Sequence, residues 1–144
     1  MLRGMQLVRD LTTRSVATLR PSDTVERAER EMRLSGIRHL PVVDRDNVLA
    51  GMVSSRDLDR ARSSGEPVRE VMTTDVETVA EDTPLSEAAY LILRHRIGSL
   101  PACDLHGEMA GSLTEADYVR LAYPLVGGVD LEDRAVEKHE SEHP

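Results

Sequence analysis

Two short stretches of the chain combine a glycine, a hydroxyl and a carboxylate at the same spacing. They are Gly51-Met-Val-Ser54-Ser-Arg-Asp57 and Gly111-Ser-Leu-Thr114-Glu-Ala-Asp117, both of the form G-x-x-[ST]-x-x-D. A hydroxyl at a helix start lies beside backbone N–H groups that lack an intrahelical partner, where an anion such as phosphate is favoured. An aspartate one turn later can accept two hydrogen bonds from a vicinal diol, such as the ribose of a nucleotide. The spacing therefore fits a nucleotide site at each stretch.

The same spacing also fits a purely structural role. In a capping box, the hydroxyl at the helix N-cap accepts a bond from the backbone N–H three residues on, and the acidic side chain at that position bonds back to the N-cap N–H. Ser54 with Asp57, and Thr114 with Asp117, meet this requirement without any ligand. Each stretch alone favours capping, whereas the occurrence of all three residue types twice supports a ligand. Both interpretations stay open.

The two stretches occupy equivalent positions of an internal repeat. A shift of 60 aligns residues 8–62 with 68–122 without a gap, and fourteen of these 55 pairs are identical, where roughly three or four would be expected by chance. The chain therefore divides into a first copy over 8–62, a linker over 63–67, a second copy over 68–123 and an acidic tail over 124–144, expected to be flexible.

Each copy has the pattern of a β-α-β-β-α unit. In the first copy we expect strands at 16–19, 39–43 and 48–53, a long helix capped by Asp23 and ended by Gly36, and a short helix at 55–61. In the second copy the strands are 76–79, 99–103 and 109–113, with helices that begin at 83–84 and at 115. A 55-residue unit buries too little surface to be stable alone. The predicted fold class is α/β of the α+β type, with the two copies packed about a pseudo-twofold axis.

The repeat resembles the CBS domain family, in the paired arrangement often called a Bateman module. The resemblance covers residues 8–122. In the first copy it is carried by Val8-Arg-Asp-Leu11, Val16-Ala-Thr18, Gly36-Ile-Arg-His-Leu-Pro-Val-Val-Asp44 and the Gly51–Asp57 stretch. In the second copy it is carried by Val68-Arg-Glu-Val-Met72, Val76-Glu-Thr78, Ile97-Gly-Ser-Leu-Pro101, Asp104 and the Gly111–Asp117 stretch.

The resemblance implies a non-catalytic regulatory module that binds adenosine-containing ligands, such as AMP, ADP, ATP or S-adenosylmethionine, in clefts between the copies. It implies that Asp57 and Asp117 take the ribose hydroxyls and that Ser54 and Thr114 take the phosphate. No cofactor is obligatory. The rest of the implied ligand-binding set, around the base and in the Leu-Pro signatures, is Val16, Thr18, Ile37, Pro41, Val76, Thr78, Ile97 and Pro101.

Basic residues distinguish the two copies. Arg38, His39 and Arg56 are placed to meet phosphate oxygens, and arginine offers a fixed fork of donors for this purpose. Their counterparts in the second copy are uncharged: Gly98, Ser99 and Ala116. This difference predicts two unequal sites. The sequence leaves open which cleft receives the basic set, and whether His39 binds a ligand at all.

Composition excludes several classes of protein. The 144 residues carry a net charge of −8, and no apolar run approaches the ~18 residues of a membrane span, so we expect a cytoplasmic protein. The single cysteine excludes an internal disulfide or a multi-cysteine zinc site. An acidic chain with three tyrosines as its only aromatics lacks the stacking platform of a single-strand nucleic-acid binder. The last fifteen residues hold half the net charge and two histidines, His139 and His143, and predict a frayed tail, not a metal site.

The remaining residues favour interaction over catalysis. We find no nucleophile–base pair, no metal cluster and no G-x-x-x-x-G-K-[ST] phosphate loop, so we expect no enzymatic activity. The second long helix is apolar beyond one face, through Ala89, Tyr90, Leu91 and Leu93, which favours a homodimer formed by the long helices over deeper burial of this helix within the monomer. The alternative function is an interaction scaffold without a nucleotide ligand, which dimerises or docks an unidentified protein. If the module is regulatory, its target is an unidentified protein or its own oligomeric state. Cys103 is expected to be a core residue, and Asp44 and Asp104 to initiate turns.

Overall fold

A computed structural model of the chain describes residues 6–14 and 16–128. It separates into two compact units, Met1–Leu113 and Thr114–Pro144. The first unit holds the first copy together with the strands and the long helix of the second copy. The second unit begins at the hydroxyl residue of the second G-x-x-[ST]-x-x-D stretch.

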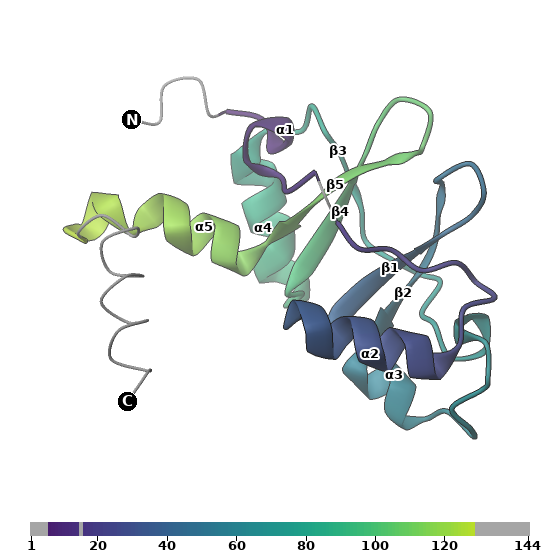
Figure 1. The fold of residues 1–144 in the computed structure, drawn as a ribbon. Coiled ribbons are helices and arrows are strands. Elements are labelled where there is room, and N and C mark those ends of the chain that lie inside the picture. The colour runs from purple at the N-terminus through teal and green to yellow at the C-terminus, as the bar shows by residue number, and fades with distance from the viewer. Residues whose placement is uncertain (1–5, 15, 129–144) are drawn as a thin grey trace, which may run out of the picture. The chain divides into compact units, whose positions relative to one another are not determined.

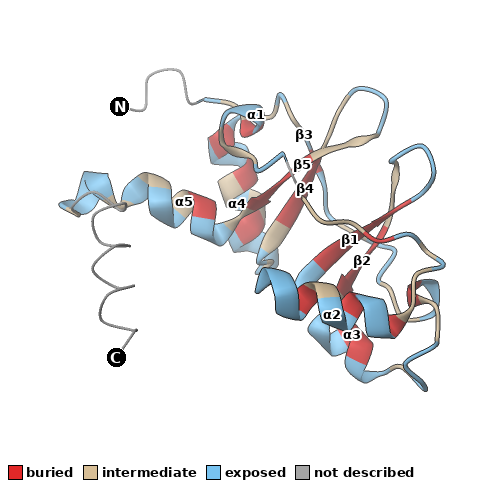
Figure 2. Cartoon of the chain, in the orientation of Figure 1, coloured by how far each residue is buried: buried red, intermediate tan, exposed pale blue. Residues whose placement is uncertain are grey.

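The first copy is a β-hairpin covered by two helices. β1 (His39–Val43) pairs antiparallel with β2 (Leu49–Ser54), and α2 (Val25–Ser35) and α3 (Ser55–Asp59) contact each other and the hairpin (Figure 1). The buried residues of α2, coloured red in Figure 2, are Val25, Ala28 and Met32, which recur at helical spacing along one face. The core consists of Leu19, Val25, Ala28, Met32, Leu40, Val42, Val53, Leu58 and Val68.

The second copy repeats this layout. β3 (Val79–Ala80) runs parallel to β4 (Ser99–Cys103), β5 (Met109–Thr114) lies on the other side of β4, and α4 (Leu85–His95) contacts β4 through its buried face. In the second unit, α5 (Glu115–Ala122) is followed by the short 3₁₀ helix η2 (Pro124–Val126). The order β-α-β-β-α is therefore confirmed, with the first strand reduced.

The start of each copy packs on the other copy. The short helix α1 (Val8–Leu11) opens the first copy, and Val8 donates its N–H to the carbonyl of Thr83 at 2.8 Å. The 3₁₀ helix η1 (Val68–Glu70) opens the second copy, and Val68 donates to the carbonyl of Asp23 at 2.8 Å. Each bond is the 60-residue translation of the other, and both valines are fully buried. The first segment of each copy thus packs on the other copy, as a pseudo-twofold arrangement requires. We call this reciprocal packing the exchange of first segments.

The glycine of each G-x-x-[ST]-x-x-D stretch is explained by this exchange. A Cβ on Gly51 would lie 2.8 Å from the carbonyl oxygen of Thr73, and a Cβ on Gly111 would lie 2.8 Å from that of Thr13. Backbone bridges join Met52 to Thr73, and Ser112 to Thr13, at the same places. Glycine is therefore required because a segment of the other copy passes against the strand.

The hairpin turns follow the prediction. One carboxylate oxygen of Asp44 accepts the N–H groups of Asp46 at 2.8 Å and Val48 at 3.0 Å. The equivalent oxygen of Asp104 accepts those of His106 and Glu108 at the same two distances. Both aspartates therefore initiate turns.

Two local predictions are wrong. Of residues 16–19, only Leu19 joins a strand, through a parallel bridge to Val42, and of 76–79 only Val79 does so. The reason is the exchange: the chain pairs with the other copy at Thr13 and must cross to β1 before it pairs again.

The N-cap of α2 is also different from the prediction. Thr24, not Asp23, caps the helix and accepts the N–H of Arg27 at 3.1 Å. Asp23 instead accepts the N–H of Arg20 at 2.7 Å, which closes the turn before the helix. Gly36 ends α2 with φ of 65°, as predicted.

The expected tail is described only at its start. Residues 124–126 form η2, which ends at Gly127 with φ of 89°. Residues 129–144, with His139 and His143, lie outside the described residues. None of the helices in the described ranges has the length and apolar content that crossing a bilayer requires.

Candidate functional site

Ser54 and Asp57 form a closed capping box between β2 and α3. The N–H of Ser54 donates to Oδ2 of Asp57 at 2.8 Å, and the N–H of Asp57 donates to Oγ of Ser54 at 3.1 Å. Asp57 is buried, with only 6% of its surface exposed. The capping interpretation is confirmed here. The hydroxyl hydrogen of Ser54 has no acceptor among the described residues, so it is free to donate to a ligand.

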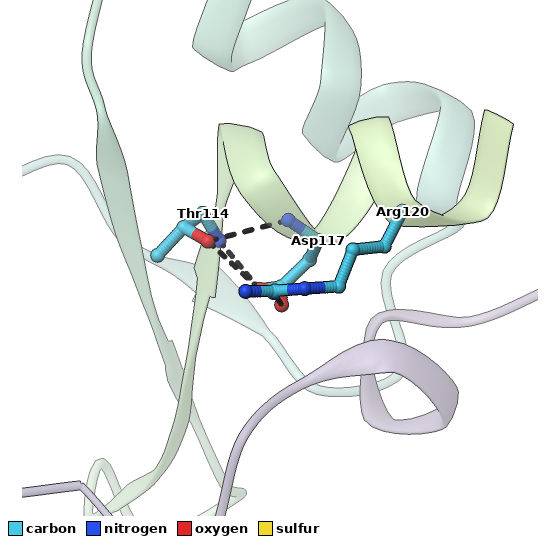
Figure 3. Close-up of polar contacts among 3 residues, drawn as sticks. All are labelled: Thr114, Asp117 and Arg120. Carbon is cyan, nitrogen blue, oxygen red and sulfur yellow. Dashed lines mark hydrogen bonds and ion pairs between the residues drawn. The ribbon is translucent and has the colours of Figure 1, made fainter. Parts of the chain in front are cut away.

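Thr114 and Asp117 repeat the box in the second unit, with one difference. The N–H of Thr114 donates to Oδ2 of Asp117 at 2.8 Å, and the N–H of Asp117 donates to Oγ1 of Thr114 at 3.4 Å. Figure 3 also shows the Thr114 hydroxyl against the carboxylate, where it donates to Oδ2 at 3.1 Å. The hydroxyl hydrogen of Thr114 is therefore already used within the cap.

An arginine one turn later reaches the second oxygen of each aspartate. Arg60 contacts Oδ1 of Asp57 through Nη2, and Arg120 lies 3.5 Å from Oδ1 of Asp117 (Figure 3). The arginine side chains are about two-thirds exposed, at 69% and 66%. A carboxylate has about four acceptor positions, so both aspartates keep capacity for further hydrogen bonds.

The Ser54–Asp57 box opens into a cleft of about 530 Å³ within the first unit, which we name the inter-copy cleft. Two repeat-equivalent segments meet in it, because a Cβ on Gly98 would lie 3.9 Å from Cε1 of His39. The first copy lines the cleft with Arg38, His39, Met52, Ser54, Ser55, Arg56 and Asp57. The second copy lines it with Thr73, Asp75, Val76, Glu77, Arg96, Ile97, Gly98 and Ser99.

Free basic groups converge on this cleft. The side chains of Arg38, His39, Arg56 and Arg96 have no hydrogen-bond or ion-pair partner among the described residues. Three carboxylates also line the cleft, those of Asp57, Asp75 and Glu77. Asp57 is held in its cap, and Oε1 of Glu77 lies 4.0 Å from Nε2 of His95, a residue outside the lining. Unpartnered guanidinium groups in a concave site suit an anionic ligand, in spite of the net negative charge of the chain.

The structure brings together part of the expected site. Seven of the expected residues line the inter-copy cleft: Arg38, His39, Ser54, Arg56, Asp57, Val76 and Ile97. The structure places the basic set in the same cleft as the first capping box.

The other expected residues lie elsewhere. Thr78 lines a smaller hollow of about 290 Å³, together with Val76. Val16, Thr18 and Ile37 are half-buried and line neither hollow, and Pro41 and Pro101 are buried within β1 and β4. Thr114 and Asp117 belong to the second unit.

Three charged lining residues were missed by the sequence reasoning. They are Asp75, Glu77 and Arg96. The available signal for Arg96 was its alignment with Gly36, because a helix-ending glycine replaced by an arginine is unusual. Asp75 and Glu77 flank Val76, which was singled out only for its apolar side chain.

Cys103, predicted to be a core residue, is only half-buried at the end of β4. Burial raises the pKa of its thiol, and the neighbouring carboxylate of Asp104 raises it further. Within the described residues, no group of three or more histidine, cysteine, aspartate or glutamate side chains is placed to hold a metal ion.

Comparison with known proteins agrees with this geometry. Residues 8–64 and 68–123 each match the CBS domain family. Among solved structures, the acetoin utilization protein AcuB from Vibrio cholerae is 37% identical with a TM-score of 0.77, and the match covers 83% of this chain and 92% of AcuB. CBSX2 in complex with AMP is 29% identical with a TM-score of 0.76, over 83% of this chain and 97% of CBSX2.

A third structure is the CBS domain pair of protein MJ0100 in complex with 5′-methylthioadenosine and S-adenosyl-L-methionine. It is 28% identical with a TM-score of 0.71, over 80% of this chain and 94% of that one. The chain spans about a quarter of the length of the first curated relatives, which are named as enzymes and are 34% identical in the matched part. The two matched copies, their reciprocal exchange and these neighbours show that the chain belongs to the CBS domain family, as a tandem pair.

Proposed function

We propose that the chain is a non-catalytic regulatory module that binds an adenosine-containing ligand in the inter-copy cleft. One observation carries the proposal: three kinds of group line a single cleft of about 530 Å³. They are the buried carboxylate of Asp57, the hydroxyl of Ser54, whose hydrogen has no acceptor among the described residues, and basic side chains without a partner among them. A vicinal diol, a phosphate and a flat apolar base are the groups that such a lining can bind together. A location in the cytoplasm is part of the same proposal.

Each lining residue has a role in this proposal. The Asp57 carboxylate accepts the ribose hydroxyls through the acceptor positions that Ser54 and Arg60 leave free. The Ser54 hydroxyl donates to a phosphate oxygen, together with Arg38, His39 and Arg56. The apolar side chains of Val76 and Ile97, both half-buried, contact the base from the second copy.

Related structures support this choice of ligand class. CBSX2 was solved with AMP, and the MJ0100 domain pair with 5′-methylthioadenosine and S-adenosyl-L-methionine. These ligands share adenosine and differ in what is attached at the 5′ position. The common part matches the role proposed for Asp57, and the basic residues favour an anionic 5′ group, as in AMP, ADP or ATP.

The second G-x-x-[ST]-x-x-D stretch is proposed to bind a nucleotide weakly or to select a less charged ligand. The hydroxyl hydrogen of Thr114 is used by Asp117, whereas that of Ser54 is not. In the second stretch Ala116 stands where the first has Arg56, so this phosphate donor is missing there. We therefore expect one strong nucleotide site per chain.

The proposal is tested by thermal shift and calorimetry of the full chain with AMP, ADP, ATP and S-adenosylmethionine. A ligand at 100 times its dissociation constant should stabilise the fold by about 2.7 kcal/mol. Asp57→Ala should abolish this effect, whereas Asp59→Ala, at an exposed position of the same helix, should keep it. Asp57→Asn is the second variant. It keeps an oxygen that accepts the N–H of Ser54, so a loss of ligand stabilisation in this variant would not be due to a folding defect. Absence of stabilisation by every ligand at millimolar concentration would contradict the proposal.

A second candidate function, a dimerising scaffold, is favoured by the outer face of α4. Tyr90 and Leu93 are 60% and 78% exposed there, beside the half-buried Ala89 and Leu91. Leu34 on α2 is similarly exposed, at 76%. Exposed apolar side chains on both long helices suit contact with a second copy of the chain. Sedimentation should show a dimer that Leu93→Lys dissociates, and a monomer at all concentrations would remove this candidate.

A further inference from the structure

Arg96 has a backbone conformation that arginine seldom adopts. It ends α4 with φ of 53° and ψ of 44°, in the left-handed region. The equivalent residue, Gly36, ends α2 with φ of 65° and ψ of 29°. The left-handed region disfavours residues with a Cβ, and glycine is the usual residue at this helix-ending position. Two copies with the same turn thus use different residues, and the second one bears the conformational cost.

The side chain of Arg96 extends the basic lining of the inter-copy cleft. The last turn of α4 and its cap carry three basic residues, Arg94, His95 and Arg96, of which Arg96 is the one that lines the cleft. His95 instead approaches Glu77 at 4.0 Å. Among the described residues, the guanidinium of Arg96 has no acceptor, so no hydrogen bond or ion pair of that part of the chain holds it.

We propose that Arg96 is a specificity-determining residue that contacts the phosphate groups of the ligand and favours a polyphosphate over adenosine. This inference rests on the function proposed above. Arg38, His39 and Arg56 come from the first copy, whereas Arg96 comes from the second, so the phosphates are contacted from both sides of the cleft. The planar fork of a guanidinium binds two phosphate oxygens at once, and each added phosphate supplies further acceptors.

The left-handed turn is the device that places this arginine. In the first copy, the residue after Gly36 is the half-buried Ile37, and in the second it is the half-buried Ile97. Both turns therefore lead into their strands through an isoleucine at the same position. The left-handed conformation of Arg96 is part of the turn that places it in the cleft lining.

The test uses Arg96→Gly, which should move stability and affinity in opposite directions. Without ligand, the melting temperature should rise by about 3 °C, because glycine relieves the left-handed backbone. The affinity for ATP should fall about tenfold, which corresponds to about 1.4 kcal/mol. The affinity for AMP should fall less, and that for adenosine should not change. Arg96→Asn should give the same affinities, because asparagine tolerates this conformation.

The control is Arg94→Ala, which removes the same charge from the last turn of α4 outside the cleft lining. It should leave the ATP affinity within a factor of two of the wild type. If Arg96→Gly raises the melting temperature but binds ATP as the wild type does, Arg96 only ends the helix and the inference is wrong. An equal loss for adenosine and ATP would also overturn it. If the wild-type chain binds none of these ligands, the proposed function fails, and this inference with it.

Discussion

The segments Gly36-Ile-Arg38-His39 and Arg96-Ile-Gly98-Ser99 share a backbone and differ in charge. Both begin with a left-handed residue, continue with a half-buried isoleucine and enter a strand whose next residue, Leu40 or Leu100, is fully buried. The first segment has its basic residues at its third and fourth positions, Arg38 and His39, and the second has one at its first position, Arg96. The isoleucines and the fully buried leucines are the same in the two segments, whereas the residues at the other three positions differ. Under the proposed function, we therefore expect the cleft to act as one composite site and not as two equal ones.

The hydrogen bonds of the two capping boxes also combine a shared structural role with one difference. Both hold the aspartate by the N–H of the hydroxyl residue at 2.8 Å, so both perform the structural task. The Thr114 hydroxyl donates to its own aspartate at 3.1 Å, but the Ser54 hydroxyl has no such bond. A motif shared by both copies thus serves the fold twice, and only the first copy retains a hydroxyl hydrogen for a ligand.

The largest expected effect concerns what the copies share. Gly51→Ala and Gly111→Ala should each lower the free energy of unfolding by about 1–3 kcal/mol, because the new Cβ meets a backbone carbonyl. Gly65→Ala is the control, since a Cβ there has no neighbour within 4 Å. Urea denaturation measures all three. A large loss for Gly51→Ala with none for Gly111→Ala would show that the exchange is not reciprocal.

Removal of either aspartate should separate the structural role from the ligand role. Asp57→Ala and Asp117→Ala should each cost about 0.5–2 kcal/mol, the usual value for a lost cap. Denaturant unfolding should find similar losses, because the two boxes are alike. Calorimetry with ATP should find binding lost for Asp57→Ala and kept for Asp117→Ala. The opposite result would move the strong site to the second copy.

Exchange of the basic residues should alter affinity with little effect on folding. The double variant Arg38→Gly with His39→Ser gives the first copy the residues of the second. ATP affinity should fall at least tenfold, with a shallower dependence on salt, because charge-assisted bonds to phosphate are lost. Both side chains are exposed, so unfolding should change by no more than about 0.5 kcal/mol. Unchanged ATP affinity would exclude these side chains as phosphate ligands.

The smallest expected effect concerns Cys103, whose counterpart is Val43. Since burial and Asp104 raise its pKa, the folded chain holds the thiol proton more tightly than the unfolded chain does. Stability should be unaffected at neutral pH and should decrease slightly as the pH rises past the ordinary thiol pKa. Alkylation at pH 8 should be slower than that of a free cysteine, and Cys103→Val should remove the alkaline decrease. Fast alkylation of the folded chain would contradict this.

The sequence predicted the element order, the hairpin turns and both capping boxes, because these depend on local spacing. It predicted the repeat because the two copies align without a gap at a shift of 60. It did not predict the exchange of first segments, which depends on Val8 and Val68 packing on the opposite copy. That exchange also explains why residues 16–18 do not form a strand. Arg96 was missed because its place in the cleft lining depends on a backbone conformation that its residue type disfavours. Pro41 and Pro101 follow the family pattern but are buried within strands, away from the cleft lining.

The most direct test is a thermodynamic cycle between the ribose diol and Asp57. ATP and 2′,3′-dideoxy-ATP are titrated by calorimetry into the wild-type chain and into Asp57→Asn. We expect loss of the hydroxyls to weaken binding to the wild type by about tenfold or more, and to have little further effect on the variant. Equal losses in both proteins, or equal affinity of the wild type for both ligands, would contradict the claim that Asp57 binds the ribose in the inter-copy cleft.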